Sequence, residues 1–549
     1  MSQYTITANF VDLFQRTVYP AEVTVEGGII KSVSKTSTSS DHFLLPGFVD
    51  AHVHIESSML VPSAFARLAV VHGTVATVSD PHEIANVCGA EGVRFMIENS
   101  KQTPFKVFFG APSCVPATVF ETAGATLDAK AVEELLADKD IWYLAEMMNY
   151  PGVLHRDEEV MAKIAAAKAV NKPIDGHAPG LRGNLVEQYA DAGITTDHES
   201  FTLEEATDKV KYGMYCLIRE GSAARNFDAL IDIIRTNPYA VMFCSDDKHP
   251  DELVLHHINH HVRRAVKLGY DLFDVLRAAS MNPVIHYGLP VGLLREGDPA
   301  DFILVKNLND FEVIETYISG VKVAENGTSL LPHIPVSPIN NFKAKTIEVS
   351  DLEIPVVPDV KLVRVIDAIE GQLVTNESTA TPVIKDGCLV SDVQQDVLKI
   401  AVINRYETEA KPAVAFIRNF GLKRGALAST VAHDCHNIIV VGADDESMAA
   451  AVNALVEAKG GISVALGKDE VHCMPLPVAG LMTDKDGYEV AREYSLLDKM
   501  AKEQLGTPLK APFMTLSFMA LLVIPALKLS DKGLFDGAKF QFADLQIKV

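Results

Sequence analysis

Six residues of metal-binding types occur in a fixed order in the first half of the chain: His52, His54, Glu146, His177, His198 and Asp246. Each lies at or just after the end of a short apolar run typical of a β-strand. A (β/α)₈ barrel carries its active site at the C-terminal ends of its strands. Two divalent ions held there can activate one water molecule and polarise the group that it attacks. The order therefore predicts a metal-dependent hydrolase.

His52 and His54 form the strongest local motif. Residues i and i+2 of a strand point to the same face, so both imidazoles can reach one ion. Two histidines on one strand face are more often structural, but here a Leu45-Pro46-Gly47 turn leads into the strand that they end. We therefore predict that both are ligands.

Glu146, His177 and His198 complete the predicted set of ligands around the second ion. Glu146 follows the apolar run 142–145, where a buried carboxylate is costly unless it is paired or metal-bound. Its two oxygens could bridge two cations, whereas the alternative is a solvated glutamate at a strand end. Imidazole and carboxylate ligands suit Zn, Mn, Fe or Co, and the residue types alone do not rank these metals.

Two adjacent acids, Asp246 and Asp247, follow the run 240–245. One of them should face the ions and carry a proton between water and leaving group. Asp246 is favoured because it is the first acid after the strand, and Asp247 could instead hold substrate or cap the next helix. Ser57 and Glu83 lie in loops at the same end of the barrel and are further candidates for substrate binding.

A separate polar cluster, His433-Asp434-Cys435-His436, precedes a β-like run near the C-terminus. We interpret it as surface polarity or as part of a lid over the active site. A separate metal site is the alternative.

Eight strand candidates alternate with helical patterns such as 158–170 and 253–268, as expected for a barrel of about this length. The candidates are 48–51, 74–79, 106–109, 141–145, 173–176, 194–197, 214–218 and 240–245. We therefore assign residues 46–291 to a (β/α)₈ barrel of the α/β class.

Two β-rich segments flank the barrel, and a further domain follows them. Residues 1–45 and 292–335 both show strand-turn-strand patterns, so we expect one composite β-sandwich domain. The stretch 331–345 is proline-rich and polar, as in a linker. Residues 346–549 mix strands with a helix at 445–458 that Lys459-Gly460-Gly461 should end, so we expect a C-terminal α+β domain.

Composition excludes several classes of protein. A net charge of −23 argues against nucleic-acid binding, which needs a basic face. The seven cysteines are scattered without a C-x-x-C motif and indicate reduced thiols in a cytoplasmic protein. The N-terminus lacks the pattern of a signal peptide. The apolar stretch 513–527 is too short to span a membrane, so we expect no membrane partner.

The chain resembles the adenine deaminases of the amidohydrolase superfamily over nearly its whole length. The matching segments are LPGFVDAHVHIESSML (45–60), SDPHEIANV (79–87), AEMMNYPGV (145–153), DGHAPGL (175–181), CSDDKHPDEL (244–253), GLLREGDPADFILV (292–305) and AHDCHNIIVVG (432–442). The His-x-His motif and the segment 292–305 mark the superfamily broadly. HIESSML, DPHEIANV and Glu146 are more specific, because dihydroorotases and hydantoinases carry a carbamylated lysine in place of this glutamate.

The resemblance implies a particular use of the six residues. His52, His54 and Asp246 would bind one ion, His177 and His198 the other, and Glu146 would bridge them. A hydroxide shared by two ions, Mn²⁺ or Fe²⁺ before Zn²⁺, would attack C6 of adenine. Asp246 would pass the proton to the leaving amine, giving hypoxanthine and ammonia without an organic cofactor.

The resemblance also bears on assembly and on the alternatives. We expect a homodimer in the cytoplasm whose partners are adenine and water. The alternative enzyme is a cyclic amidohydrolase acting on a related nitrogen heterocycle, which the same ligands would serve. A catalytically silent interaction protein would have lost ligands, and all six are present.

Overall fold

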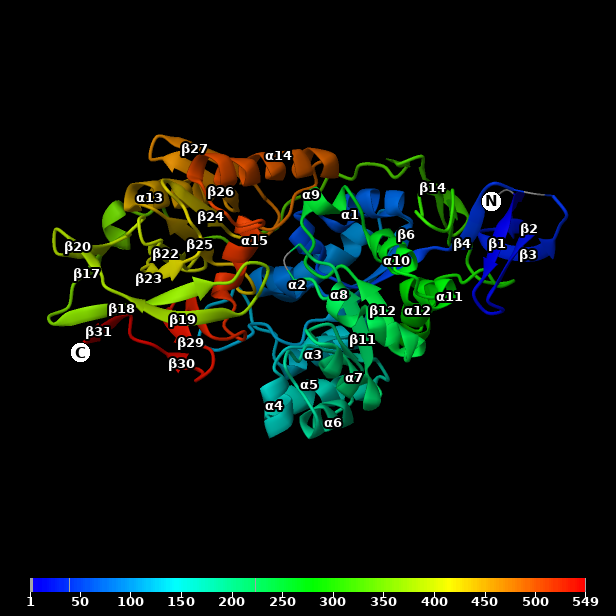
Figure 1. Ribbon diagram of the computed structural model, residues 1–549, viewed down its shortest axis with the longest axis horizontal. Coiled ribbons are helices and arrows are strands. Elements are labelled where there is room, and N and C mark those ends of the chain that lie inside the picture. Colours follow the sequence, from blue (N-terminus) through cyan, green and yellow to red (C-terminus); the bar gives the residue numbers. More distant parts are fainter. Residues whose placement is uncertain (1–2, 39, 223, 549) are drawn as a thin grey trace.

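A computed structural model describes residues 3–38, 40–222 and 224–548. The molecule is elongated, with a barrel at its centre, a β domain that includes the N-terminal strands at one end and a C-terminal domain at the other (Figure 1). No helix in the described part of the chain is both long and apolar enough to cross a membrane.

Eight parallel strands form the barrel: β5 (Phe48–Val53), β6 (Thr74–Ser79), β7 (Lys106–Ala111), β8 (Ile141–Met147), β9 (Ile174–Gly176), β10 (Thr196–Asp197), β11 (Tyr215–Arg219) and β12 (Val241–Cys244). Each predicted strand coincides with one of these to within two residues at either end. The strand predictions are therefore confirmed.

Hydrogen bonds close the strands into a ring. β5 to β9 form one parallel sheet and β10 to β12 another. The Thr195 N–H donates to the Ile174 carbonyl at 2.9 Å and so joins the two sheets. On the other side, the Asp246 N–H donates to the His52 carbonyl at 2.9 Å. This last bond places Asp246 directly beside the His-x-His motif.

Helices cover the outside of the ring, which explains why both faces of its strands are apolar. They are α1 (Pro62–Ala69), α2 (His82–Ser100), α3 (Ala129–Leu136), α4 (Tyr150–His155), α5 (Glu158–Ala169), α6 (Asn184–Asp191), α7 (Leu203–Lys211), α8 (Phe227–Leu230), α9 (Pro250–Leu253), α10 (Ile258–Lys267), α11 (Leu272–Leu276) and α12 (Asn282–Tyr287). Local sequence sets several of their starts. Thr202 and Glu205, for example, form a capping box at the start of α7, which satisfies backbone N–H groups that the helix leaves free.

Strands that precede the barrel in the sequence and strands that follow it form one eight-stranded sheet, at the end of the molecule that carries the N-terminus. It contains β1 (Tyr4–Asp12), β2 (Thr17–Glu26), β3 (Ile29–Lys35), β4 (Phe43–Pro46), β13 (Phe302–Val305), β14 (Val313–Ile318), β15 (Val321–Glu325) and β16 (Thr328–Ser329). β4 pairs with β13, which joins the two halves, and Phe10, Val23 and Phe302 lie in their common core.

The C-terminal domain is built on a nine-stranded sheet, with two small sheets beside it. The large sheet contains β18 (Val360–Ala368), β19 (Thr375–Ala380), β22 (Leu398–Ile403), β23 (Ala413–Arg418), β24 (Ala426–Ser429), β25 (Ile438–Gly442), β26 (Gly461–Gly467), β27 (Glu470–Pro475) and β31 (Gln546–Lys548). The small sheets contain β17 (Ile354–Pro355), β20 (Val383–Lys385) and β21 (Cys388–Val390), and β28 (Leu527–Ser530), β29 (Gly533–Asp536) and β30 (Gln541–Phe542).

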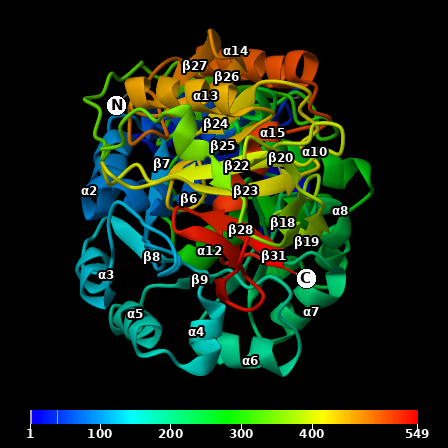
Figure 2. The ribbon, with the colours of Figure 1, turned by 90° about the vertical axis from the view of Figure 1, so that its left-hand side faces the viewer.

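Two long helices pack against this sheet. α13 (Asp445–Ala458) forms a core with one face of it, whereas the buried side chains of α14 (Gly487–Met500) belong to the core shared with the barrel, where α14 contacts α9. Both helices lie along the top of Figure 2, in which the C-terminal domain faces the viewer. The bounds of α13 match the predicted helix at 445–458. The apolar segment 513–527, which includes α15 (Pro512–Ser517), is largely buried. Three residues at its centre, Phe518, Leu521 and Ile524, line a cavity at the end of the barrel.

Candidate metal centre

The barrel brings all six predicted ligands into one buried cluster. None of them is more than 6% exposed, and they form overlapping groups close enough to share metal ions. The cluster follows from the strand ends: β5 supplies His52, β8 supplies Glu146, and residues that follow β5, β9, β10 and β12 supply the others.

The carboxylate of Glu146 lies between the two groups of histidines. Its Oε1 is 3.3 Å from Nε2 of His54. Its Oε2 is 2.7 Å from Nδ1 of His177 and 3.3 Å from Nε2 of His198. One oxygen thus faces each group, as a carboxylate that bridges two cations requires.

The ring of His54 is oriented to offer a lone pair to a cation. Its Nδ1 lies 3.2 Å from the carbonyl of Asp80, which can only accept, so the proton is on Nδ1 and Nε2 carries the lone pair. That Nε2 faces Asp246 Oδ1 at 3.3 Å and His52 Nε2 at 3.2 Å. A convergence of electron-pair donors buried away from water is the arrangement that a divalent cation stabilises, and such supporting contacts to a ring nitrogen are typical of metal-binding histidines.

The two carboxylates of the cluster are held in their charged forms. Burial alone would raise the pKa of Glu146, but contacts with His177 and His198 hold that pKa well below its usual range. Burial would likewise raise the pKa of Asp246, and Arg219 and His54 hold it well below. Both residues can therefore serve as anionic ligands at neutral pH.

A buried lysine fixes the two histidines that follow β9 and β10. Lys209 Nζ donates to Asp197 Oδ2 at 2.6 Å and to the Ala178 carbonyl at 2.8 Å. Asp197 Oδ1 accepts from the Ala178 N–H at 2.9 Å. The network clamps the backbone directly after His177 and directly before His198. Removing one partner of such a buried pair leaves an uncompensated charge and is strongly destabilising.

Asp50 performs the same task where the barrel closes. Its Oδ1 accepts from the Ser245 N–H at 2.9 Å, and its Oδ2 lies 2.8 Å from His257 Nε2. Asp246 follows immediately, with a φ of 54°. A non-glycine residue in this left-handed region is uncommon and often marks a functional site. Here the turn aims the Asp246 carboxylate at His52 and His54.

Sequence reasoning missed two charged residues beside the cluster, Arg219 and Glu199. The Arg219 guanidinium donates to Asp246 Oδ2 at 2.6 Å and to both oxygens of Glu199. Glu199 Oε1 is 3.5 Å from His198 Nε2. An arginine directly after the apolar run 215–218 was an available signal, because a buried charge needs a partner.

His82 was also missed as a neighbour of the cluster. Its Nδ1 is 3.1 Å from Asp80 Oδ2 and 3.5 Å from Glu146 Oε1. It is 3% exposed and follows β6, so its place at a barrel strand end was the signal.

The three predicted substrate contacts are all near the cluster, with their polar atoms variously engaged. Ser57 donates to Asp247 Oδ1 at 2.5 Å. Asp247 and Glu83 line the cavity over the cluster. Both oxygens of Glu83 are bonded to histidines of the C-terminal domain, His433 and His436.

The interpretation of the 433–436 segment as surface polarity is wrong, because His433 is 2% exposed. His433 instead lines the cavity over the cluster, in keeping with the expected lid contact, and with Glu83 and His436 it also forms a group that could hold an ion.

Two cavities lie where the C-terminal domain meets the barrel. The cavity over the cluster has a volume of about 20 Å³ and is closed partly by Phe518, Leu521 and Ile524. This is room for about one water molecule, so its lining must move to admit a larger molecule.

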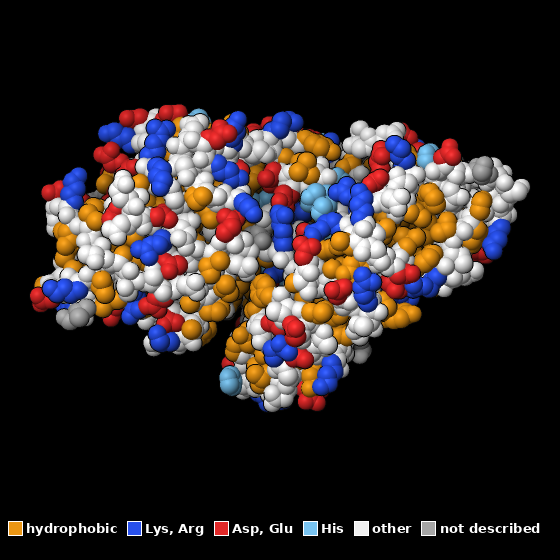
Figure 3. Space-filling view, viewed as in Figure 1, with side chains coloured by type: hydrophobic (Ala, Val, Ile, Leu, Met, Phe, Trp, Pro, Cys, Tyr) orange, Lys and Arg blue, Asp and Glu red, His pale blue; other side chains and the backbone are white. Residues whose placement is uncertain are grey.

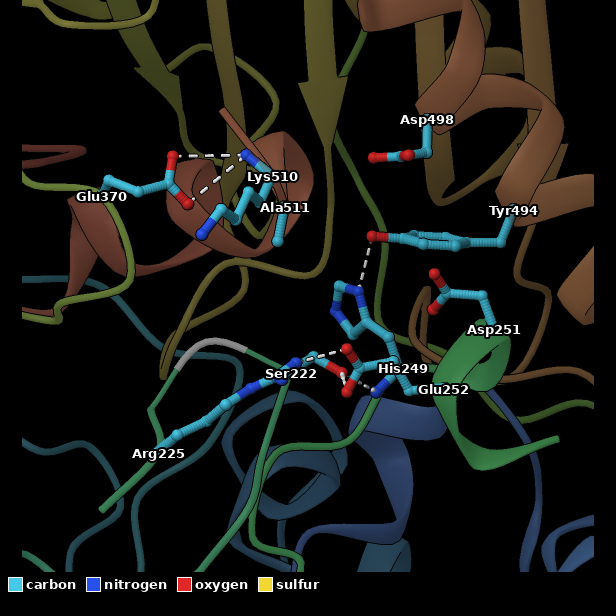
Figure 4. Close-up of a pocket in the computed structure, with 10 residues that line it drawn as sticks. All are labelled: Ser222, Arg225, His249, Asp251, Glu252, Glu370, Tyr494, Asp498, Lys510 and Ala511. Carbon is cyan, nitrogen blue, oxygen red and sulfur yellow. Dashed lines mark hydrogen bonds and ion pairs between the residues drawn. The ribbon is translucent and has the colours of Figure 1, made fainter. Parts of the chain in front are cut away.

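The second cavity, of about 340 Å³, lies beside the first and is lined by His249 and Tyr494. A 2.6 Å hydrogen bond joins His249 Nδ1 and the Tyr494 hydroxyl. Glu370 and Lys510 lie across the cavity from them (Figure 4). Asp247 lines the first cavity and His249 lines the second. The molecular surface is hollowed along the same junction (Figure 3).

Two family models match the chain. Residues 43–323 match the amidohydrolase family, and residues 372–541 match the adenine deaminase C-terminal domain. Among solved structures, a β-aspartyl dipeptidase from Fervidobacterium islandicum aligns with 60% of this chain and 98% of its own, at 16% identity and a TM-score of 0.47.

Relatives that match over nearly the whole length are much more similar. An adenine deaminase of Sulfurovum sp. (strain NBC37-1) is 56% identical, and the match covers 98% of each chain. That of Salinibacter ruber is 55% identical over 99% of each chain. That of Methanosarcina acetivorans is 54% identical over 97% of this chain and 98% of its own. With the barrel, the buried cluster and the C-terminal domain all matched, the chain belongs to the adenine deaminases of the amidohydrolase family.

Proposed function

We propose that the buried cluster hydrolyses adenine to hypoxanthine and ammonia, the reaction implied by the names of the relatives. The observation that carries this proposal is the carboxylate of Glu146, with one oxygen toward His54 and the other toward His177 and His198. That geometry suits a pair of divalent ions, and hydrolysis is the chemistry that such pairs support.

Each of the six residues has a place in this proposal. His52, His54 and Asp246 would hold one ion, His177 and His198 would hold the other, and Glu146 would contact both. When bound, the two ions supply Lewis acidity that activates water at neutral pH and polarises the purine. His54 is oriented for this role by Asp80, and His177 and His198 are oriented by the network of Asp197 and Lys209.

Asp246 also moves a proton. It passes a proton from the attacking water to the exocyclic nitrogen, which leaves as ammonia. Its Oδ2 is held by Arg219 at 2.6 Å, so Oδ1 remains directed at the centre of the cluster. Asp247, one residue further, is the alternative shuttle and shares the cavity. The C-terminal domain excludes bulk water, which strengthens the electrostatic interactions inside.

Ammonia release from a panel of substrates tests the proposal. Purified, metal-reconstituted protein should release ammonia from adenine much faster than from adenosine, cytosine or dihydroorotate. A cyclic amidohydrolase with the same ligands would instead turn over dihydroorotate or a related ring, and that result would contradict the adenine assignment.

The metal content should approach two equivalents per chain. Six ligands, one of them a bridging carboxylate, provide two sites, which we propose are filled by Mn²⁺ or Fe²⁺, with Zn²⁺ as the alternative. Elemental analysis of fully active protein gives the number and the identity of the ions. A fully active preparation with one equivalent would contradict the two-ion assignment.

Adenosine should be a far poorer substrate than adenine. The cavity over the cluster has a volume of about 20 Å³ and is closed on one side by Phe518, Leu521 and Ile524. We expect that an opening just sufficient for a purine excludes a ribose on N9. The ratio of kcat/KM for the two compounds measures this effect, and comparable values would show that the pocket is open.

We also propose that the protein is a homodimer in the cytoplasm. Two-fold dimers are the commonest assemblies of soluble enzymes. The seven cysteines are free thiols, in keeping with a reducing compartment. Light scattering during gel filtration would give the mass of the assembly.

A further inference from the structure

We propose that His433, a residue of the C-terminal domain, donates a hydrogen bond from Nε2 to a ring nitrogen of the purine, and that Glu83 and His436 position its ring. The inference rests on the function proposed above and names a residue that recognises the substrate. It also gives Glu83 a different role from direct substrate contact.

The anchor begins at His436, which is 1% exposed. Its Nδ1 lies 3.1 Å from the backbone N–H of Ala432, which can only donate, so Nδ1 carries the lone pair. Burial lowers the pKa of His436 and favours the neutral ring. A neutral imidazole then has its single proton on Nε2. That Nε2 donates to Glu83 Oε2 and fixes the carboxylate.

The other oxygen of Glu83 fixes His433. Oε1 accepts from His433 Nδ1, and the His433 ring stacks on Phe518 with 4.5 Å between centroids and 13° between planes. Two independent contacts therefore set both the position and the plane of the imidazole. The Glu83 and His433 residues are 350 positions apart in the chain, so the barrel and the C-terminal domain build this unit together.

The remaining nitrogen of His433 points to the substrate side. Nε2 is buried and has no hydrogen-bond partner among the described residues. His433 lines the same cavity as Glu146, His198 and Asp246. A buried polar atom without a partner is costly, and here a ligand in the cavity can supply the partner.

The three residues Glu83, His433 and His436 also lie close enough to hold an ion. A metal between them would need a lone pair on His436 Nε2. The Ala432 N–H already claims the lone pair on Nδ1, so Nε2 carries a proton instead. The group therefore orients hydrogens, in contrast to His54, whose Nε2 is free of hydrogen.

The charges around His433 favour a donor at Nε2. Glu83, Asp247 and Asp434 all face the ring, with Asp247 Oδ1 at 4.0 Å from Nε2. Burial lowers the pKa of His433, but Glu83 and Asp247 outweigh it and raise this pKa to about 9. When water adds at C6, electron density moves onto the purine ring nitrogens. A preorganised donor at one of them is stabilising in the transition state.

Two substitutions at the same position separate this role from a structural one. In His433→Asn the amide nitrogen takes the place of Nδ1 and keeps the contact with Glu83, but nothing replaces Nε2. In His433→Gln the amide reaches the position of Nε2. We expect His433→Asn to lower kcat/KM for adenine by roughly 10- to 100-fold, the range for a hydrogen bond that involves a charged group. His433→Gln should recover a large part of this loss.

Analogues of adenine that lack one ring nitrogen identify the contact. For the wild-type protein, one of 1-deaza-, 3-deaza- and 7-deazaadenine should bind at least about 10-fold more weakly than adenine because its acceptor is missing. In His433→Asn that same difference should disappear, while the other two analogues behave as before. Inhibition constants measured against adenine deamination provide these values.

Controls distinguish the possible failures. Metal content should be unchanged in both variants, and His472→Asn, at a 44%-exposed side chain, should behave as wild type. A wild-type protein that does not deaminate adenine would overturn the proposed function itself. If the wild-type protein does deaminate adenine, but His433→Asn has the same kcat/KM and the same differences between analogues, only the role of His433 is overturned.

Discussion

Glu146→Gln should lower turnover of adenine by more than about 100-fold and reduce the metal content below two equivalents. Replacing even a residue that merely supports a ligand costs 10- to 100-fold in activity or affinity, and Glu146 faces both halves of the cluster. The amide keeps one oxygen but puts an NH₂ group in place of the other. That group faces either His54 or the pair His177 and His198. A donor there repels a cation, so at least one ion should bind more weakly.

The fold should survive this change, because glutamine is nearly isosteric with glutamate. Circular dichroism and thermal unfolding check the fold, and elemental analysis checks the metal. Glu121→Gln is a matched control. Glu121 is 5% exposed, and its pKa is raised to about 8, mainly by burial and further by the nearby charge of Asp434. Its protonated carboxyl already resembles an amide at neutral pH, so activity should remain. Metal content and turnover near wild type in Glu146→Gln would place the metal site elsewhere.

Asp246→Asn should reduce turnover by roughly 10²- to 10⁴-fold, the contribution typical of a positioned proton-transfer group. The asparagine cannot accept the proton of the attacking water, and it also loses its charge-assisted bond with Arg219 at 2.6 Å. A shuttle acts in the chemical step, so kcat should fall more than affinity for adenine.

Asp247→Asn is the comparison that decides which acid carries the proton. Asp247 shares the cavity with Asp246 and is bonded to Ser57. Its loss should alter KM more than kcat if it holds substrate. Steady-state kinetics of both variants, each with its metal content measured, give the answer. A larger fall in kcat for Asp247→Asn would assign the shuttle to Asp247.

The sequence by itself determined the barrel and the order of its candidate ligands. Strand periodicity is local, so the eight runs could be found to within two residues at either end. Polar residues at successive strand ends must then converge, because parallel strands end at the same face of a barrel. His52, His54 and Glu146 were recognisable for this reason, as were His177, His198 and Asp246.

Only the tertiary structure decided which residues support these ligands. Arg219 and Asp246 are 27 positions apart, and Glu83 contacts His436 across 353 positions. No local pattern specifies such pairs, because they depend on how the barrel and the C-terminal domain pack. The segment around His433 looked like any exposed polar stretch. It becomes a buried group over the active site because the apolar segment 513–527 packs there and removes its charges from water.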